Sequence, residues 1–109
     1  MALSFTVVLR GADTLDIYVV DVEGGEAVII QNPSGQAALI DGGMLGQNGR
    51  DLKRVTAGAQ ALGIKQFDFM LITHYDVDHV GNIPAIFAQF PAKLLVDHGP
   101  LLPNPGMLA

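Results

Sequence analysis

The stretch FDFMLITHYDVDHVGN, residues 67–82, decides the fold of this chain. Its opening part, residues 67–73, is an almost continuous apolar run, which predicts a fully buried strand. Two histidines and two aspartates then occupy four of the next six positions, as His74, Asp76, Asp78 and His79. Because ligand-binding side chains gather at the carboxyl ends of strands in α/β sheets, this cluster predicts a functional site there.

The sequence before this stretch indicates strands. Residues 15–22, LDIYVVDV, alternate well enough to predict a strand with Ile17 and Val19 on one face. Two further apolar runs lie within residues 26–41, and the Asn-Pro-Ser-Gly turn signal at 32–35 separates them. Residues 26–41 therefore predict a β-hairpin.

Helical spacing begins after this hairpin. Leu52, Val55, Ala59 and Leu62 recur at helical intervals, with Asp51 placed to cap the start and Gly63 to end the helix. Pro84 suits the first turn of a second helix that would run to about residue 90, and residues 93–96 read as another short strand. Strands that alternate with helices in this order predict an α/β fold.

The composition indicates one ordered domain over residues 1–109, with a loose proline-rich tail at 100–109. Half of the residues are apolar and 16% are charged, which argues against disorder. The net charge of -5 makes nucleic acid an unlikely partner, and the cluster of Arg50, Lys53 and Arg54 reads as a solvated helix face. The chain has no cysteine, so disulfides and thiolate ligands are excluded.

The start of the chain, MALSFTVVLRG, has neither a basic leading segment nor a cleavage signature, and it does not read as a signal peptide. No apolar segment is long enough to span a bilayer. We therefore expect a soluble, cytoplasmic protein without membrane partners. An exported form whose leader has been removed is the alternative.

The clustered side chains at 74–79 are suited to a metal. His74 and Asp76 lie two positions apart, so in an extended segment both point the same way and can share one cation. Asp78 and His79 would hold a second cation or complete the first, while Val77 and Val80 pack inward. Such nitrogen and oxygen ligands bind zinc at about 2.0–2.2 Å and also accept manganese or iron. The alternative is a solvated polar turn.

The order His74-x-Asp76-x-Asp78-His79 resembles the H-x-H-x-D-H signature of the metallo-β-lactamase superfamily. The run DVEGGEAVIIQNPSGQAALIDGG, residues 21–43, is similar to the opening hairpin of that superfamily, and the likeness extends to the β-lactamase-like domain of DNA-uptake channel proteins. The resemblance implies the N-terminal half of an αββα sandwich, a mixed β-sheet with flanking helices.

The resemblance also implies roles for individual residues. His74 and Asp76 would bind the first metal, and Asp78 and His79 the second. Asp41 would orient the motif loop, although it also reads as a turn residue at the end of the hairpin. Zinc is the metal that the superfamily implies. Asp76 replaces the usual histidine with a harder ligand, which moves the preference toward manganese, iron or magnesium and argues against a true β-lactamase.

The implied activity is hydrolysis of an ester, lactone, amide or phosphodiester by water activated on one or two divalent metal ions. Asp78 could take up the proton of that water. A serine nucleophile is not supported, because neither Ser4 nor Ser34 lies in an elbow motif. His98 and its neighbour Asp97 are weaker candidates at the rim of the site. Thr73 and Tyr75 read as structural residues, although Tyr75 could face the substrate.

The resemblance finally implies ligands that this sequence does not contain. Members of the superfamily carry a further histidine, a bridging aspartate and a final histidine downstream of the motif. We therefore expect the chain to pair with a copy of itself or to be the N-terminal part of a longer protein. The alternative function is a catalytically inactive half-domain that binds metal or self-associates.

Overall fold

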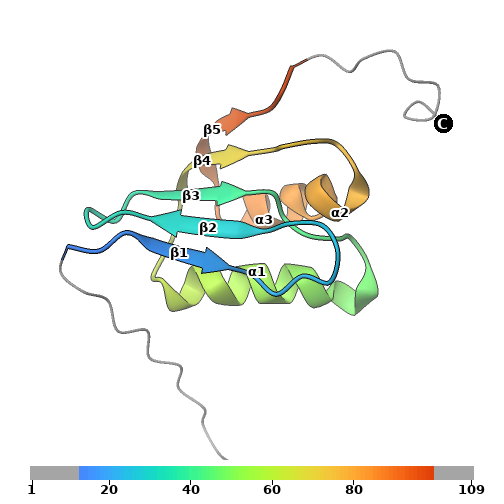
Figure 1. The fold of residues 1–109 in the computed structure, drawn as a ribbon, viewed down its shortest axis with the longest axis horizontal. Coiled ribbons are helices and arrows are strands. Elements are labelled where there is room, and N and C mark those ends of the chain that lie inside the picture. Colours follow the sequence, from blue (N-terminus) through green and yellow to red (C-terminus); the bar gives the residue numbers. More distant parts are fainter. Residues whose placement is uncertain (1–12, 100–109) are drawn as a thin grey trace, which may run out of the picture.

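Residues 13–99 are described by the computed structural model, and they form a single sheet with the strand order β1-β2-β3-β4-β5 (Figure 1). The strands are β1 (Asp16–Val19), β2 (Val28–Gln31), β3 (Ala37–Ile40), β4 (Phe67–Leu71) and β5 (Ala92–Val96). The first three strands pair antiparallel, whereas β3, β4 and β5 pair parallel. The prediction of an α/β fold with a mixed sheet is confirmed. The predicted tail at 100–109 and the start of the chain lie outside the described residues.

The hairpin turn forms as the sequence predicts. The Asn32 side-chain oxygen accepts a hydrogen bond from the Gln36 N–H at 2.9 Å, and Gly35 has the positive φ of 89° that favours glycine. Ile29 pairs with Leu39 across β2 and β3. The register places both side chains on the buried face of the sheet.

The helices are α1 (Arg50–Ala61), α2 (Val77–Val80) and α3 (Ile83–Gln89), and the short 3₁₀ helix η1 (Gln47–Gly49) precedes α1. Gly63, with a φ of 70°, follows the end of α1, and Pro84 lies in the first turn of α3, as predicted. The prediction that Asp51 caps α1 is wrong. Gly49 occupies the N-cap position, and Asp51 lies inside the first turn with its carboxylate bonded elsewhere.

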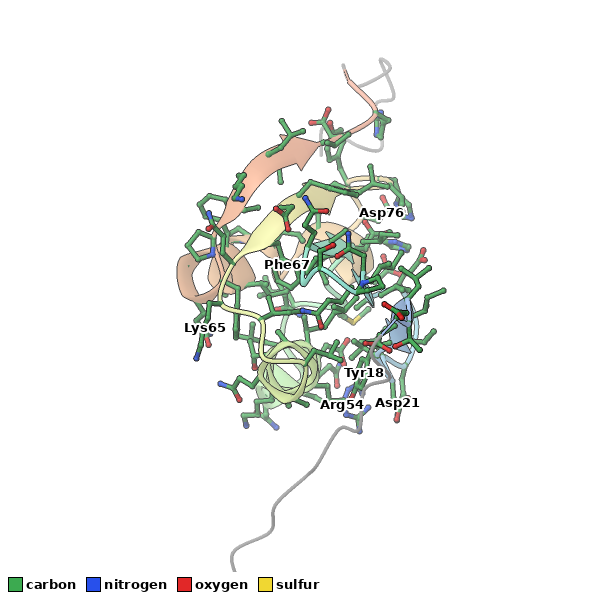
Figure 2. All side chains as sticks on the ribbon, turned by 90° about the vertical axis from the view of Figure 1, so that its left-hand side faces the viewer. Tyr18, Asp21, Arg54, Lys65, Phe67 and Asp76 are labelled. Carbon is green, nitrogen blue, oxygen red and sulfur yellow. The ribbon has the colours of Figure 1, made fainter. Side chains whose placement is uncertain are left out.

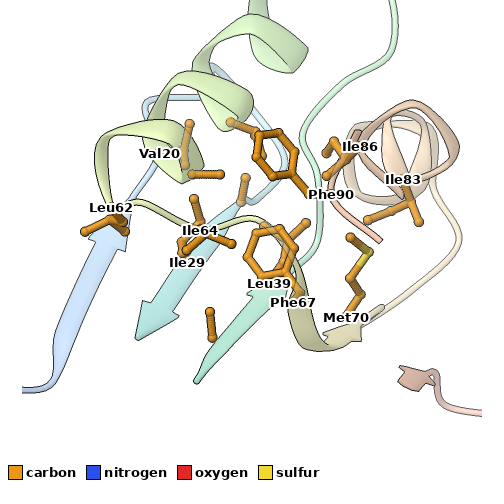
Figure 3. Packing of buried hydrophobic residues seen from close by; sticks show 14 of the residues in the cluster. Val20, Ile29, Leu39, Leu62, Ile64, Phe67, Met70, Ile83, Ile86 and Phe90 are labelled. Carbon is orange, nitrogen blue, oxygen red and sulfur yellow. The ribbon is translucent and has the colours of Figure 1, made fainter. Parts of the chain in front are cut away.

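One face of the sheet packs against α1 and α3 and forms the core (Figure 3). Figure 3 shows Leu39, Phe67 and Met70 of the sheet facing residues of α3 and the segment that follows it. The rings of Phe67 and Phe90 meet edge to face with centroids 6.2 Å apart. Tyr18 of β1 lies over Gly58 of α1, where an added Cβ would come within 2.8 Å of the tyrosine ring.

The opposite face of the sheet carries apolar side chains with no helix over them. Ile17 and Val19 lie on one face as predicted, and they are 61% and 73% exposed. Phe69, which pairs with Ala38 of β3 and Leu94 of β5, is 39% exposed on the same face. The prediction that the strand at 67–73 is fully buried is therefore wrong at Phe69 and at Thr73, which is also exposed. We call this surface, made up of Ile17, Val19, Ile30, Phe69 and Leu94, the open face.

Among the helices of residues 13–99, none combines the length and the apolar character needed to cross a membrane.

Candidate metal centre

The candidate site lies at one edge of the sheet, where β1, β3 and β4 end (Figure 1). Parallel strands place their carboxyl ends at the same edge, so Asp41 after β3 meets the motif after β4. Backbone hydrogen bonds hold the two segments together. The Asp41 N–H donates to the Leu71 carbonyl at 2.9 Å, and the Gly42 N–H donates to the His79 carbonyl at 2.8 Å.

Asp41 is the buried centre of this edge. Its side chain is fully buried, and its backbone has a φ of 57°, a left-handed conformation that aspartate tolerates better than most residues. One carboxylate oxygen accepts the Thr73 N–H at 2.9 Å, and the other accepts the Thr73 hydroxyl and lies 2.8 Å from Nδ1 of His79. An ionised carboxylate only accepts hydrogen bonds, so this contact suits the tautomer of neutral His79 that carries its proton on Nδ1 and has its lone pair on Nε2.

The four motif residues come together in contacting pairs. Nδ1 of His74 lies 3.2 Å from the Asp76 carboxylate, and Nε2 of His79 lies 3.9 Å from the Asp78 carboxylate. The rings of His74 and His79 join the pairs, with centroids 3.6 Å apart. The chain is extended at Asp76, the N-cap of α2, as the shared direction of His74 and Asp76 requires.

Only one of the two valines of α2 packs inward, whereas the sequence predicts this for both. Val80 packs against the core as expected. The prediction that Val77 packs inward is wrong, because its side chain is 52% exposed. Val77 is the first residue of α2, directly after the extended Asp76, and at this end of the helix its side chain projects toward solvent.

A closer set of possible ligands includes a residue that the sequence did not single out. Among residues 13–99, one set of three histidine or acidic side chains has ligand atoms within 4.8 Å of one another: Glu26, Asp41 and His79. His74, Asp76 and Asp78 lie outside this set. The sequence offered a weak signal for Glu26, since it precedes the β2 strand directly after two glycines.

The segment between β1 and β2 packs directly on the motif helix. A Cβ added to Gly25, which has a φ of 82°, would lie 2.0 Å from the Asp78 carbonyl oxygen, so only glycine fits there. The same segment is tied to α1 by ion pairs between Arg50 and Glu23 at 3.0 Å and between Arg54 and Asp21 at 3.4 Å. Figure 2 shows Arg54 beside Asp21. Two of the three basic residues predicted as a solvated face are therefore paired.

Buried polar groups support the loop after Asp41. Asp51 accepts hydrogen bonds from the Met44 N–H and from Arg50, both at 2.8 Å. Burial raises the pKa of Asp51, but these hydrogen bonds outweigh it and hold the pKa below its usual range. The Asn82 amide donates to the carbonyl oxygens of Gly42 and Met44 at 3.0 and 2.9 Å. The loop is thereby fixed from two sides.

Tyr75 and His98 meet next to the motif. Their rings are in contact with centroids 4.5 Å apart and planes tilted by 44°, and the Tyr75 hydroxyl donates to the Gly99 carbonyl at 3.0 Å. Asp97 accepts the Gly99 N–H at 2.9 Å. The Asp97 carboxylate beside the Tyr75 hydroxyl raises the pKa of Tyr75, and the Tyr75 hydroxyl together with the Gly99 N–H lowers the pKa of Asp97. Tyr75 thus connects the motif loop to the end of β5.

The chemistry of the donors fits a divalent cation. Imidazole nitrogens and carboxylate oxygens are ligands of zinc, manganese and iron, and no thiolate competes with them. The 2.8 Å contact between Asp41 and His79 has the form of the carboxylate–histidine pairs that orient imidazole ligands in metalloproteins.

Comparison with known proteins agrees with this fold. The family model described as "Metallo-beta-lactamase superfamily" matches residues 20–103. Among solved structures, the chain is similar to a metallo-β-lactamase from Cronobacter sakazakii (Enterobacter sakazakii), a HARLDQ motif mutant, with a TM-score of 0.60 and 23% identity. That alignment covers 75% of this chain and 31% of the other, so the chain spans about a third of its length. No match was found among curated proteins. Since the family model covers most of its length, the chain belongs to the metallo-β-lactamase superfamily.

Proposed function

We propose that this chain provides the metal-binding motif of a hydrolase, with His74, Asp76, Asp78 and His79 as ligands of one or two divalent cations. The observation that supports this most is the 2.8 Å contact between Asp41 and Nδ1 of His79, which leaves Nε2 available as a ligand. The His74 ring, 3.6 Å from the His79 ring between centroids, places a second imidazole beside it. These are the positions at which the superfamily motif carries its ligands.

When bound, such a cation polarises a carbonyl or phosphoryl group and lowers the pKa of water toward neutrality. The residues of this chain would hold and orient the ions and move a proton. Asp78 is suited to accept that proton, because its carboxylate lies 3.9 Å from Nε2 of His79, next to the ligand nitrogen. We propose an ester, lactone, amide or phosphodiester as substrate. Zinc is favoured by the family, and Asp76 favours manganese or iron.

Metal content and hydrolysis test the proposal together. The purified chain is loaded with Zn²⁺ or Mn²⁺, its bound metal is measured by elemental analysis, and a panel of esters, lactones, amides and phosphodiesters is assayed. We expect stoichiometric metal that is lost in Asp78→Asn and retained in Asp13→Asn. Asp13 is an exposed residue that precedes β1, at the end of that strand away from the site. Equal metal content in both variants would contradict the proposed ligand set.

The open face supports a second function, a self-associating half-domain without catalytic activity. It exposes Ile17, Val19 and Leu94, each by more than half of its surface, and a depression of about 310 Å³ beside Ile30 and Phe69. Contiguous apolar surface of this kind marks an interaction site. We propose that a second copy of the chain, or the remainder of a longer protein, covers it. Stoichiometric metal without turnover, together with a dimer in sedimentation, would favour this function.

A further inference from the structure

Glu26 lies outside the motif, yet its carboxylate reaches the motif's most buried histidine. A carboxylate oxygen of Glu26, an oxygen of Asp41 and a ring nitrogen of His79 are all within 4.8 Å of one another. These residues come from three separate segments: the connection between β1 and β2, the end of β3, and α2. The sheet topology, not sequence proximity, brings them to one point.

The backbone on both sides of Glu26 is fixed. Its carbonyl accepts the Gly43 N–H at 2.9 Å, and the carbonyl of the next residue, Ala27, accepts the Val20 N–H at 2.9 Å. On its other side, Gly25 is pressed against the Asp78 carbonyl so closely that a Cβ would come within 2.0 Å of the oxygen. The half-buried Glu26 side chain is therefore held next to the motif helix by its backbone, not by a flexible loop.

Asp41, His79 and Glu26 differ in how many of their possible ligand atoms are already engaged in hydrogen bonds. The Asp41 carboxylate is already engaged by the Thr73 N–H, the Thr73 hydroxyl and Nδ1 of His79. His79 retains Nε2. Within residues 13–99, no hydrogen bond or ion pair engages the Glu26 carboxylate, although it is half-buried beside two polar groups. A half-buried carboxylate without such a partner is stabilised by a bound cation.

We propose that Glu26 is a ligand of the divalent cation held by His79, through its carboxylate. The inference rests on the proposed metal-binding function and adds a ligand that the motif does not contain. Two ligands bound at about 2.0–2.2 Å lie no more than about 4.4 Å apart on one ion. A ring nitrogen of His79 lies within 4.8 Å of a Glu26 carboxylate oxygen, so the two side chains are near enough to share one ion once the Glu26 side chain rotates toward it. Glu26 would be a carboxylate ligand in addition to Asp76. Carboxylate oxygens are hard ligands, so the added carboxylate favours manganese or iron over zinc.

Mn²⁺ binding to the full chain tests this ligand, with electron paramagnetic resonance of free Mn²⁺ and calorimetry as readouts. Glu26→Gln removes the charge and keeps the shape, and we expect it to weaken Mn²⁺ binding at least about tenfold. Glu23→Gln is the matched control from the same segment, because Glu23 is exposed and pairs with Arg50. We expect its affinity to stay within about threefold of the unmodified chain.

Two further measurements separate the possible failures. Thermal unfolding in EDTA shows whether Glu26→Gln folds as stably as the parent chain without metal; we expect equal midpoints and a smaller upward shift on adding Mn²⁺. A lower midpoint in EDTA with an unchanged metal-induced shift would overturn the ligand role. Asp78→Asn tests the motif itself. If Asp78→Asn loses Mn²⁺ while Glu26→Gln keeps it, the role of Glu26 is wrong and the proposed function stands; if neither variant loses Mn²⁺, or the parent chain binds none, both are wrong.

Discussion

Replacing Asp41 tests whether this buried carboxylate sets both the stability of the fold and the orientation of His79. In Asp41→Ala the Thr73 N–H loses its acceptor in a part-buried hydrogen bond, which costs about 1–3 kcal/mol. Alanine at the φ of 57° adds about 1–2 kcal/mol of backbone strain. The free energy of unfolding should therefore fall by about 2–5 kcal/mol, a large part of the roughly 5–15 kcal/mol typical of a domain.

Asp41→Asn separates orientation from strain. Asparagine tolerates the left-handed backbone and keeps an acceptor for the Thr73 N–H, so we expect a loss of only about 1–2 kcal/mol. Its amide N–H, however, faces Nδ1 of His79, which then becomes the acceptor and moves its proton to Nε2. Because Nε2 is the nitrogen left for metal, the affinity for Zn²⁺ or Mn²⁺ should fall about 10- to 100-fold.

Urea unfolding in EDTA gives the stability of each variant, and calorimetric titration gives its metal affinity. Asp13→Asn serves as the control for removing one acidic charge, since Asp13 is exposed. The reasoning is refuted if Asp41→Asn binds metal like the parent chain, or if Asp41→Ala unfolds within about 0.5 kcal/mol of it.

Three other perturbations test the packing, the buried carboxylate and the open face. Gly25→Ala should destabilise the fold by more than Gly24→Ala, since both have positive φ but only Gly25 meets a backbone carbonyl, at 2.0 Å; urea unfolding compares them, and equal losses would contradict the close packing. The lowered pKa of Asp51 means that its contribution is present near neutral pH and lost as pH falls below about 4 through the folded-state pKa. Asp51→Asn should therefore flatten the acid limb of the stability–pH curve, and an unchanged limb would argue against it. If two copies pair through the open face, Val19→Lys should shift sedimentation from dimer to monomer without unfolding the chain, because Val19 is 73% exposed there; a sedimentation coefficient that matches the parent chain would contradict pairing through this face.

Local signals in the sequence determined much of the secondary structure and the presence of the motif. The turn at 32–35, the helix end at Gly63 and the proline at the start of α3 depend on bonds within a few residues, which the residue types specify directly. The motif was readable for a similar reason, because its histidines and aspartates are close in sequence and follow one strand. The family resemblance implies that Asp41 orients the motif loop. In the structure its carboxylate lies 2.8 Å from Nδ1 of His79 in that loop.

Only the tertiary structure decided which side chains are exposed and which distant residues meet, because both depend on strand order, on register and on the face of the sheet that the helices cover. The composition of residues 67–71 predicts burial, but Phe69 is exposed because α1 and α3 cover only the opposite face. Asp51 bonds the Met44 N–H and does not cap its helix, because the loop after β3 returns over the first turn of α1. Glu26 reaches His79 only because β1, β3 and β4 end at one edge of the sheet. Contacts of this kind join residues far apart in the chain, so no local pattern records them.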